Sequence, residues 1–291
     1  MSNVTVKTVH LETDDQKQKF DEFIKQIPDI IKVSQYDELF GHQLSSDGEY
    51  FNQDVFHALV YKFLVANEFD LGLTREQLTK TLKWRKEFNP LSAAFNEDHD
   101  SKFDDIGILT TYSNNEANTK NITWNLYGAG GNPKELFKDL DKFLRYRVGL
   151  MERNVQLLDF TKPENNFATQ IHDYKGVSFL KFDPDVKKGS KATIQIFQDY
   201  YPELLYKKFF VNVPSLLFWV FEFVKKFLSD TTTRKFIVLN NSENLVKYLG
   251  NDVPKIYGGK GDSLKNQNVK EIKPPVYGAH LSQELFTNEV D

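Results

Sequence analysis

Short runs rich in β-branched and aromatic residues alternate with longer helical patterns in the second part of the chain. This alternation constrains the fold most, because strands that alternate with helices form a sheet with parallel crossovers. Helical patterns occupy residues 133–160, 189–201 and 215–228. We therefore expect an α/β fold here, with strands in "IGILTTYS" (106–113), "KNITWNLYG" (120–128), "IHDYKGVSFLKFD" (171–183), "KKFFVNVP" (207–214) and "RKFIVLN" (234–240).

The first part of the chain has a different pattern. "DQKQKFDEFIKQIPDIIKV" (15–33) spaces its apolar residues by three and four, which predicts a helix with a break near Pro28. Two further helical patterns follow, and Asn89-Pro90 is expected to end this region. We expect a helical unit over 1–95, a ligand-binding α/β domain over 96–266 and a polar, extended or loosely ordered tail over 267–291.

Composition narrows the class of protein. The net charge of -4 argues against a nucleic-acid binder, and the absence of Cys excludes disulfides and thiolate metal sites. The longest apolar stretch, 213–224, contains Glu222 and is shorter than the roughly 20 residues that span a bilayer. No secretory signal opens the chain, and no hydrolase, kinase or zinc-enzyme motif is present. We expect a soluble, cytoplasmic protein that is not an enzyme, with peripheral membrane contact at most.

Three features of the sequence are each open to a structural or a ligand-related interpretation. Alternation along 171–183 puts His172 and Tyr174 on one face of the predicted strand. Tyr174 is either a buried phenol satisfied by a backbone carbonyl or a ligand contact. Arg147 falls inside the apolar stripe of its predicted helix. It is either a snorkelling or paired arginine or a partner for an anionic ligand. The predicted helix 215–228 is apolar nearly all round. This pattern is typical either of a buried core helix or of a lid that contacts a membrane surface.

Four stretches together resemble the CRAL-TRIO family. They are "ANEFD" followed by "LKWRKEFNP", then "HDYKGVS" (172–178), "YYPELLYKKFFVNVP" (200–214) and "KIYGGKGD" (255–262). Within the family, "WRKEFNPLSAAF", "TWNLYG" and "RYRVGLME" are most similar to the haem-binding subgroup of its fungal phosphatidylinositol-transfer branch. The resemblance implies a helical N-terminal unit on an α/β lipid cage, with a β-sheet floor and a mobile gate helix at 215–228.

The resemblance also implies a function and its residues. It points to a phosphatidylinositol transfer protein that serves phosphoinositide homeostasis, contacts membranes transiently through 215–228 and associates peripherally with endoplasmic reticulum or microsomal membranes. The family's headgroup contacts fall on Glu203, Thr232 and Lys235. Glu68 replaces a basic residue of the family pattern, which puts the contribution of the N-terminal unit to this site in question.

The subgroup further implies haem b as a cofactor and a link to oxidant or haem stress. Tyr174 stands at the position of the axial iron ligand, where relatives that bind only lipid carry an aliphatic residue. His172 would flank the porphyrin, Tyr127 would line the pocket, and Arg147 and Lys208 would pair with the propionates. Two alternatives stay open: a lipid carrier without haem, and an interaction protein with an empty cage.

Overall fold

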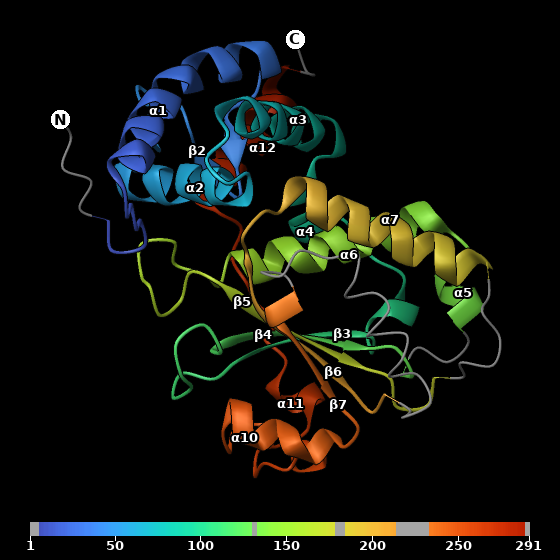
Figure 1. The fold of residues 1–291 in the computed structure, drawn as a ribbon. Helices are drawn as coiled ribbons and strands as arrows, with labels where there is room; N and C mark the ends of the chain where they lie inside the picture. The colour runs from blue at the N-terminus through green and yellow to red at the C-terminus, as the bar shows by residue number, and fades with distance from the viewer. Residues whose placement is uncertain (1–5, 130–132, 178–183, 214–232, 289–291) are drawn as a thin grey trace.

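The computed structural model describes residues 6–129, 133–177, 184–213 and 233–288. It stacks a helical N-terminal unit, a layer of helices, a five-stranded sheet and a layer of short C-terminal helices (Figure 1). This arrangement confirms the predicted α/β class. The predicted gate helix 215–228 lies outside the described residues. Within the described ranges, no helix has the length and apolar character needed to cross a membrane.

The N-terminal unit contains α1 (Asp14–Ser34), α2 (Gln53–Ala66), α3 (Leu71–Phe88) and α4 (Pro90–Phe95), with the strand pair β1 (Glu38–Leu39) and β2 (His42–Gln43). The predicted break near Pro28 is wrong, because α1 continues through it. Pro28 is on the exposed side of a helix whose opposite face buries Phe23, Ile27 and Ile30. This burial offsets the cost of about 3 kcal/mol that a proline adds within a helix.

Asn89-Pro90 ends α3, but not the helical region, because one short helix follows and reaches the predicted boundary at residue 95. Asn89 adopts a left-handed φ of 50° and its side chain caps α4, while Pro90 takes the first helical position. The short helix α4 then packs on α6 (Leu140–Val155) at Gly149, where a Cβ atom would lie 2.3 Å from the Ala93 carbonyl oxygen. After the turn η1 (Ser101–Phe103), the chain enters the sheet.

The sheet has the order β3-β4-β5-β6-β7, with β3 antiparallel to β4 and the remaining neighbours parallel. The crossovers run through α5 (Pro133–Phe137) and α6, then through α7 (Pro184–Tyr200). The single helix predicted over 133–160 is therefore divided, and Asp139 caps the start of α6. The strands are β3 (Gly107–Thr111), β4 (Asn121–Leu126), β5 (Ala168–Asp173), β6 (Leu205–Val211) and β7 (Phe236–Leu239).

The strand predicted over 171–183 ends at Asp173, so its second half is wrong as far as the structure describes it. The Asp173 carboxylate accepts a hydrogen bond from the Lys175 amide at 2.8 Å, and Gly176 takes a φ of 80°. Such a side-chain-to-backbone bond favours a turn over a continued strand. Residues 178–183 lie outside the described part of the chain.

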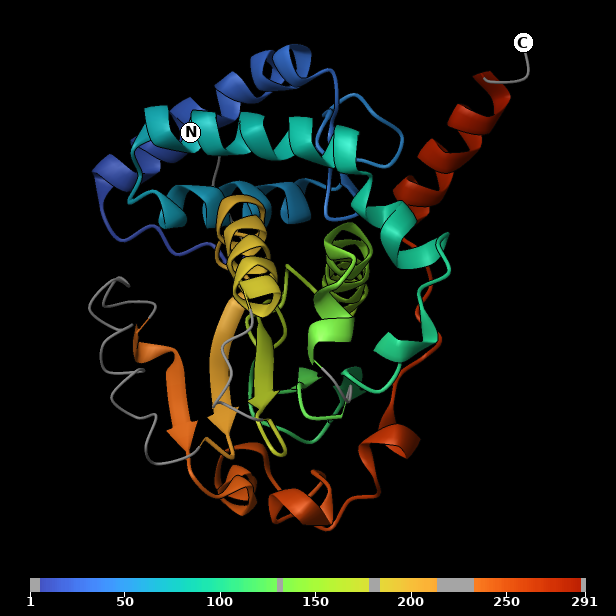
Figure 2. The same ribbon diagram turned by 90° about the vertical axis from the view of Figure 1, so that its right-hand side faces the viewer.

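The two faces of the sheet have different coverings (Figure 2). One face carries Trp124, Ile171 and Phe209, which pack in one cluster with residues of the C-terminal layer. The other face lies beneath α6 and α7 (Figure 2). The strand register puts Asn125, His172 and Phe210 on this second face. The C-terminal layer comprises η3 (Ser242–Leu245), α10 (Val246–Leu249), η4 (Lys255–Tyr257) and α11 (Leu264–Gln267).

The chain after α11 returns to the N-terminal unit. Its backbone at Val269 donates to the Leu109 carbonyl at 2.8 Å, and Arg153 donates to the Lys270 carbonyl at 2.9 Å. The segment ends in α12 (Val276–Asn288), where Tyr277 donates to the Asp37 carboxylate. The expectation of an extended or loosely ordered tail is therefore wrong for α12, because its side chains find partners on the N-terminal unit.

Arg85 joins the N-terminal unit to the α/β part of the protein. Its guanidinium contacts the Glu38 carboxylate at 2.8 Å and the Glu152 carboxylate at 2.6 Å, and all three side chains are 0% exposed. The Tyr201 hydroxyl donates to the same Glu152 carboxylate at 2.6 Å. Helix α3, strand β1, helix α6 and the end of α7 therefore meet at one buried group of charges.

Replacing Arg85 with Met tests this junction. We expect the free energy of unfolding to fall by about 3–5 kcal/mol, because two buried carboxylates lose their cation. Chemical denaturation measures the loss, and Lys83→Met, at an exposed site on the same helix, serves as the control, with a change within about 0.5 kcal/mol. A loss below about 1 kcal/mol for Arg85→Met would contradict the assignment.

Candidate ligand-binding site

Three predicted site residues lie together at the carboxyl ends of β4 and β5. Tyr127 follows β4 directly, and its amide donates to the Asp173 carbonyl at 3.1 Å. Its hydroxyl lies 2.7 Å from Nδ1 of His172, and its ring centroid lies 5.3 Å from that of Tyr174. Parallel strands end at the same edge of a sheet, which explains why two segments far apart in sequence meet here.

The buried His172 is neutral. Burial lowers its pKa well below the ordinary value, and the charges of Lys208 and Arg147 add to the effect. Burial raises the pKa of Tyr127, so its hydroxyl keeps its proton. In the arrangement that satisfies both rings, Tyr127 donates to Nδ1 of His172. The Nε2–H group then faces Oε1 of Gln170, 3.4 Å away.

Tyr174 is also a neutral phenol in this environment. Burial, followed by the neighbouring Tyr127, raises the pKa of Tyr174 well above its ordinary value. Its ring is nearly parallel to that of Phe210, with the centroids 6.5 Å apart. The nearby cations act on His172 and Tyr127 rather than lowering the pKa of Tyr174. Deprotonation of this phenol would therefore require direct coordination to a metal ion.

Arg147 and Lys208 bring two cations to the same covered face of the sheet. Arg147, on α6, is 6% exposed, which does not fit a snorkelling side chain. Lys208, on β6, is partly buried, and burial together with the Arg147 charge lowers the pKa of Lys208 to about 8. Neither residue forms an ion pair with any carboxylate in the described part of the chain. The two cations are therefore candidates for contact with an anionic ligand.

Unpartnered polar atoms line the same region. The side-chain oxygens of Thr123 and Asn125 on β4 are buried without a hydrogen-bond partner among the described residues. The Asn125 amide nitrogen lies 3.4 Å from Nε2 of His172, so this oxygen belongs to the surroundings of the predicted site. Among the residues that the structure describes, both polar atoms of the Asn154 side-chain amide, on α6, also lack a partner. Buried polar atoms are normally satisfied, and these are available to a polar ligand or to ordered water.

A second group of charges lies at the opposite end of β6. Glu203 and Lys235 form an ion pair, with Oε2 and Nζ 3.0 Å apart and side chains 23% and 22% exposed. The structure thus brings together two of the three residues that the resemblance places at the headgroup. Thr232 lies outside the described residues.

Lys62 of α2 also belongs to this second group, and the sequence interpretation missed it. Its Nζ donates to the Glu203 carbonyl at 2.8 Å, so the N-terminal unit reaches the Glu203–Lys235 pair although Glu68 is acidic. The signal was a lysine inside the apolar pattern "VFHALVYKFLVA" (55–66), the same kind of signal that singled out Arg147.

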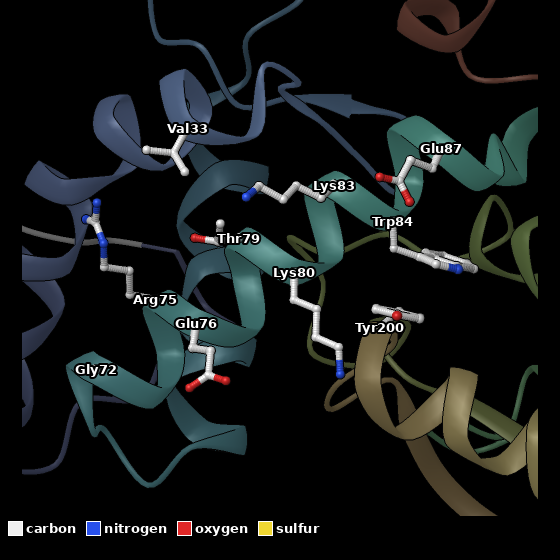
Figure 3. A pocket seen from close by; sticks show the side chains of 10 residues that line it. All are labelled: Val33, Gly72, Arg75, Glu76, Thr79, Lys80, Lys83, Trp84, Glu87 and Tyr200. Atoms are coloured by element: carbon white, nitrogen blue, oxygen red, sulfur yellow. The ribbon is translucent and has the colours of Figure 1, made fainter.

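A shallow groove of about 570 Å³ lies elsewhere, between α3, the end of α1 and the end of α7 (Figure 3). The rings of Trp84 and Tyr200 stack face to face, with centroids 4.2 Å apart. Lys80 forms an ion pair with Asp199 at 3.0 Å beside them. The groove contains none of the predicted site residues, and its charged lining mixes both signs.

Comparisons with known proteins agree with this architecture. The CRAL/TRIO domain profile matches residues 112–259. The chain is 46% identical to "Phosphatidylinositol transfer protein SFH5" of Kluyveromyces lactis, over 94% of this chain and 91% of that protein. It is 45% identical to the protein of the same name from Saccharomyces cerevisiae S288c, over 96% and 99%.

A solved structure has the same fold. The "Crystal structure of Sfh5" matches with a TM-score of 0.91 and 45% sequence identity, and the match covers 96% of this chain and 100% of the crystallised one. Two relatives above 40% identity, each matched over nearly its whole length, and a domain profile that begins after β3 and covers the other four strands agree on one assignment. The chain belongs to the CRAL-TRIO family.

Proposed function

We propose that the chain transfers phosphatidylinositol between membranes. The observation that carries the proposal is the Glu203–Lys235 pair, whose carboxylate and ammonium lie 3.0 Å apart at a partly exposed site. Membership of the family and the printed name of the relatives support it. These relatives are named as transfer proteins, in agreement with the expectation that the chain is not an enzyme.

The pair offers both contacts that an inositol phospholipid needs. A carboxylate accepts hydrogen bonds from inositol hydroxyls, and an ammonium group attracts the phosphodiester. Because the two groups neutralise one another when no ligand is bound, the free site avoids an isolated buried charge. The lipid exchanges one ion pair for another, which suits a site that must bind and release its cargo.

The cellular setting follows from this activity as part of the proposal. The apolar segment 215–228, with Lys225 and Lys226 at its end, would contact the membrane surface while the lipid enters or leaves. The protein would work in the cytoplasm, with peripheral association to endoplasmic reticulum or microsomal membranes. Its transfer activity would then support phosphoinositide homeostasis.

The double variant Glu203→Ala, Lys235→Ala tests the headgroup assignment. We expect phosphatidylinositol transfer between vesicles to fall at least about tenfold, because both polar contacts with the headgroup are lost. The control is Lys207→Ala, a lysine on β6 outside the ion pair, and we expect it to keep transfer within about twofold. Normal transfer by the double variant would contradict the assignment.

We propose haem b as a second, alternative ligand of the cage. The observation that favours it is the pair of cations, Arg147 and Lys208, that have no carboxylate partner in the described part of the chain. Two propionates would supply the missing charges. Tyr174 provides an oxygen ligand of a type known for haem iron, while His172 and Tyr127 form a neutral, hydrogen-bonded wall beside it.

The residues present are of the types that haem requires: a phenol for the iron and two cations for the propionates. When bound, haem supplies a ferric ion, and the phenol of Tyr174 is the group that would lose its proton to coordinate it. The neutral His172, with its low pKa, adds no further positive charge near the metal. Lipid and haem would compete, because the same sheet face would hold either one. A link to oxidant or haem stress belongs to this second candidate.

Replacing Tyr174 with Phe tests haem ligation. We expect the unaltered protein from haem-supplied cells to show a Soret band, and the variant to lose it because the iron ligand is gone. Tyr206→Phe, on β6, is the control and keeps the band. A colourless unaltered protein, or a Tyr174→Phe variant with an unchanged spectrum, would rule out this ligand assignment.

A further inference from the structure

Lys62 places its amino group in the interior, where no carboxylate of the described residues lies within ion-pair distance of it. The residue lies on α2 and is 4% exposed. Its Nζ donates to the Glu203 main-chain oxygen at 2.8 Å and lies 3.6 Å from the centroid of the Phe167 ring. In the ranges that the structure covers, no carboxylate forms an ion pair with Lys62. Its hydrogen bond is therefore to a backbone carbonyl rather than to a charge.

In this environment Lys62 acts mainly through its hydrogen bond, and not through a permanent charge. Burial lowers the pKa of Lys62 to about 7; the Glu203 carboxylate opposes the shift and the Lys235 ammonium reinforces it. A neutral amine donates to a carbonyl as an ammonium group does, so the bond to Glu203 survives either protonation state. The Phe167 ring adds a cation–π attraction when the amine is protonated.

The acceptor of this bond has an unusual backbone conformation. Glu203 has a φ of 50°, in the left-handed region that non-glycine residues seldom adopt. The next residue, Leu204, accepts a hydrogen bond from the Ala168 amide at 2.8 Å, which ties the segment to β5 on its other side. The direction of the Glu203 side chain follows from this conformation, and its Oε2 reaches Lys235 at 3.0 Å.

We propose that Lys62 is a positioning residue for headgroup selection. Its hydrogen bond to the Glu203 carbonyl holds the left-handed conformation that directs the Glu203 carboxylate toward Lys235 and toward the hydroxyls of a bound polyol headgroup. The inference rests on the proposed phosphatidylinositol transfer and deepens it, because it assigns headgroup selection partly to the N-terminal helical unit. The favoured cargo is an anionic phospholipid with a hydroxyl-bearing headgroup, over a choline lipid that offers no hydroxyl.

A purely structural bond would behave differently. If Lys62 only fastened α2 to the cage, its loss would lower stability and reduce the uptake of every lipid alike. A positioning role changes the preference among lipids, and it acts only while the Glu203 carboxylate is present. The ratio of two competing lipids and a double-mutant cycle therefore separate the two roles.

The experiment uses the full chain with Lys62→Met, Lys62→Arg, Glu203→Gln and the double variant Lys62→Met, Glu203→Gln. Each protein is incubated with vesicles containing equal amounts of phosphatidylinositol and phosphatidylcholine, and mass spectrometry quantifies the lipid that it retains. We expect Lys62→Met to lower the ratio of inositol to choline lipid about fivefold, because the carboxylate loses its orientation. Lys62→Arg keeps the donor and stays within about twofold of the unaltered ratio.

The cycle and the folding control complete the test. In the Glu203→Gln background, Lys62→Met should change the ratio by less than about twofold, because the group it positions is already absent. A ratio unchanged by Lys62→Met, or fully additive effects in the cycle, would overturn the positioning role. Thermal melting reports folding, and if Lys62→Met does not fold, Lys62→Gln, whose shorter side chain cannot reach the carbonyl, replaces it.

The outcome also separates this inference from the proposed function. An unaltered chain that retains inositol lipid, together with a Lys62→Met variant that does so equally well, overturns only the role of Lys62. An unaltered chain that retains no inositol lipid overturns phosphatidylinositol transfer and the inference with it.

Discussion

The buried contact of Arg85 with Glu38 and Glu152 determines how the two parts of this protein fit together. A guanidinium between two carboxylates, all without solvent exposure, is stable only when every partner keeps its position. The Tyr201 hydroxyl on Glu152 extends the constraint to the end of α7, two residues before Glu203. Because α2 and α3 belong to one helical unit, the same contact also places α2, with Lys62, against Glu203.

A comparison of two arginines in the same chain distinguishes structural from ligand-binding charge. Arg85 and Arg147 are both buried, yet Arg85 has two carboxylates and Arg147 has none among the described residues. At Arg85 the two carboxylates neutralise the buried cation and so stabilise the fold. Within the described residues, Arg147 and the nearby Lys208 have no carboxylate partner, and the same face carries a neutral histidine and amide and hydroxyl oxygens without a hydrogen-bond partner. This contrast is our physical reason for assigning that face to an anionic ligand.

The sequence predicted the sheet and its parallel crossovers, because short β-rich runs alternate with helical patterns. Period-two alternation also placed His172 and Tyr174 on one face, whereas Tyr127, which lies beside both, was indicated only by the family resemblance. Local boundaries were predicted less well. The burial of one face of α1 outweighs Pro28, and the Asp173 carboxylate ends β5 early, since it bonds to the Lys175 amide and, at 2.8 Å, to the Asn212 amide.

The apolar pattern around Lys62 marks it as an unusual lysine, but its partner could not be predicted from sequence, because that partner is a main-chain oxygen 141 residues away. A carbonyl group leaves no signature in a sequence, whereas an acidic partner at helical spacing would have done so. The left-handed conformation of Glu203 was equally hidden, because glutamate does not mark that conformation as glycine does.

The central claim is that no carboxylate in the part of the chain that the structure describes neutralises the cations on the covered sheet face. The most direct measurement is the free energy of unfolding of ligand-free protein as a function of pH, for the unaltered chain and for Lys208→Met. The folded state lowers the pKa of Lys208 from 10.5 to about 8, so the folded protein releases this proton first and its stability rises with pH between those values.

Below pH 8 the account therefore predicts that Lys208→Met is the more stable protein, by on the order of 1 kcal/mol, with an advantage that shrinks as the pH rises toward 10. Lys207→Met is the control and shows no such trend. A Lys208→Met variant that is less stable than the unaltered chain, by an amount independent of pH, would show that the protein already neutralises this charge and would contradict the account.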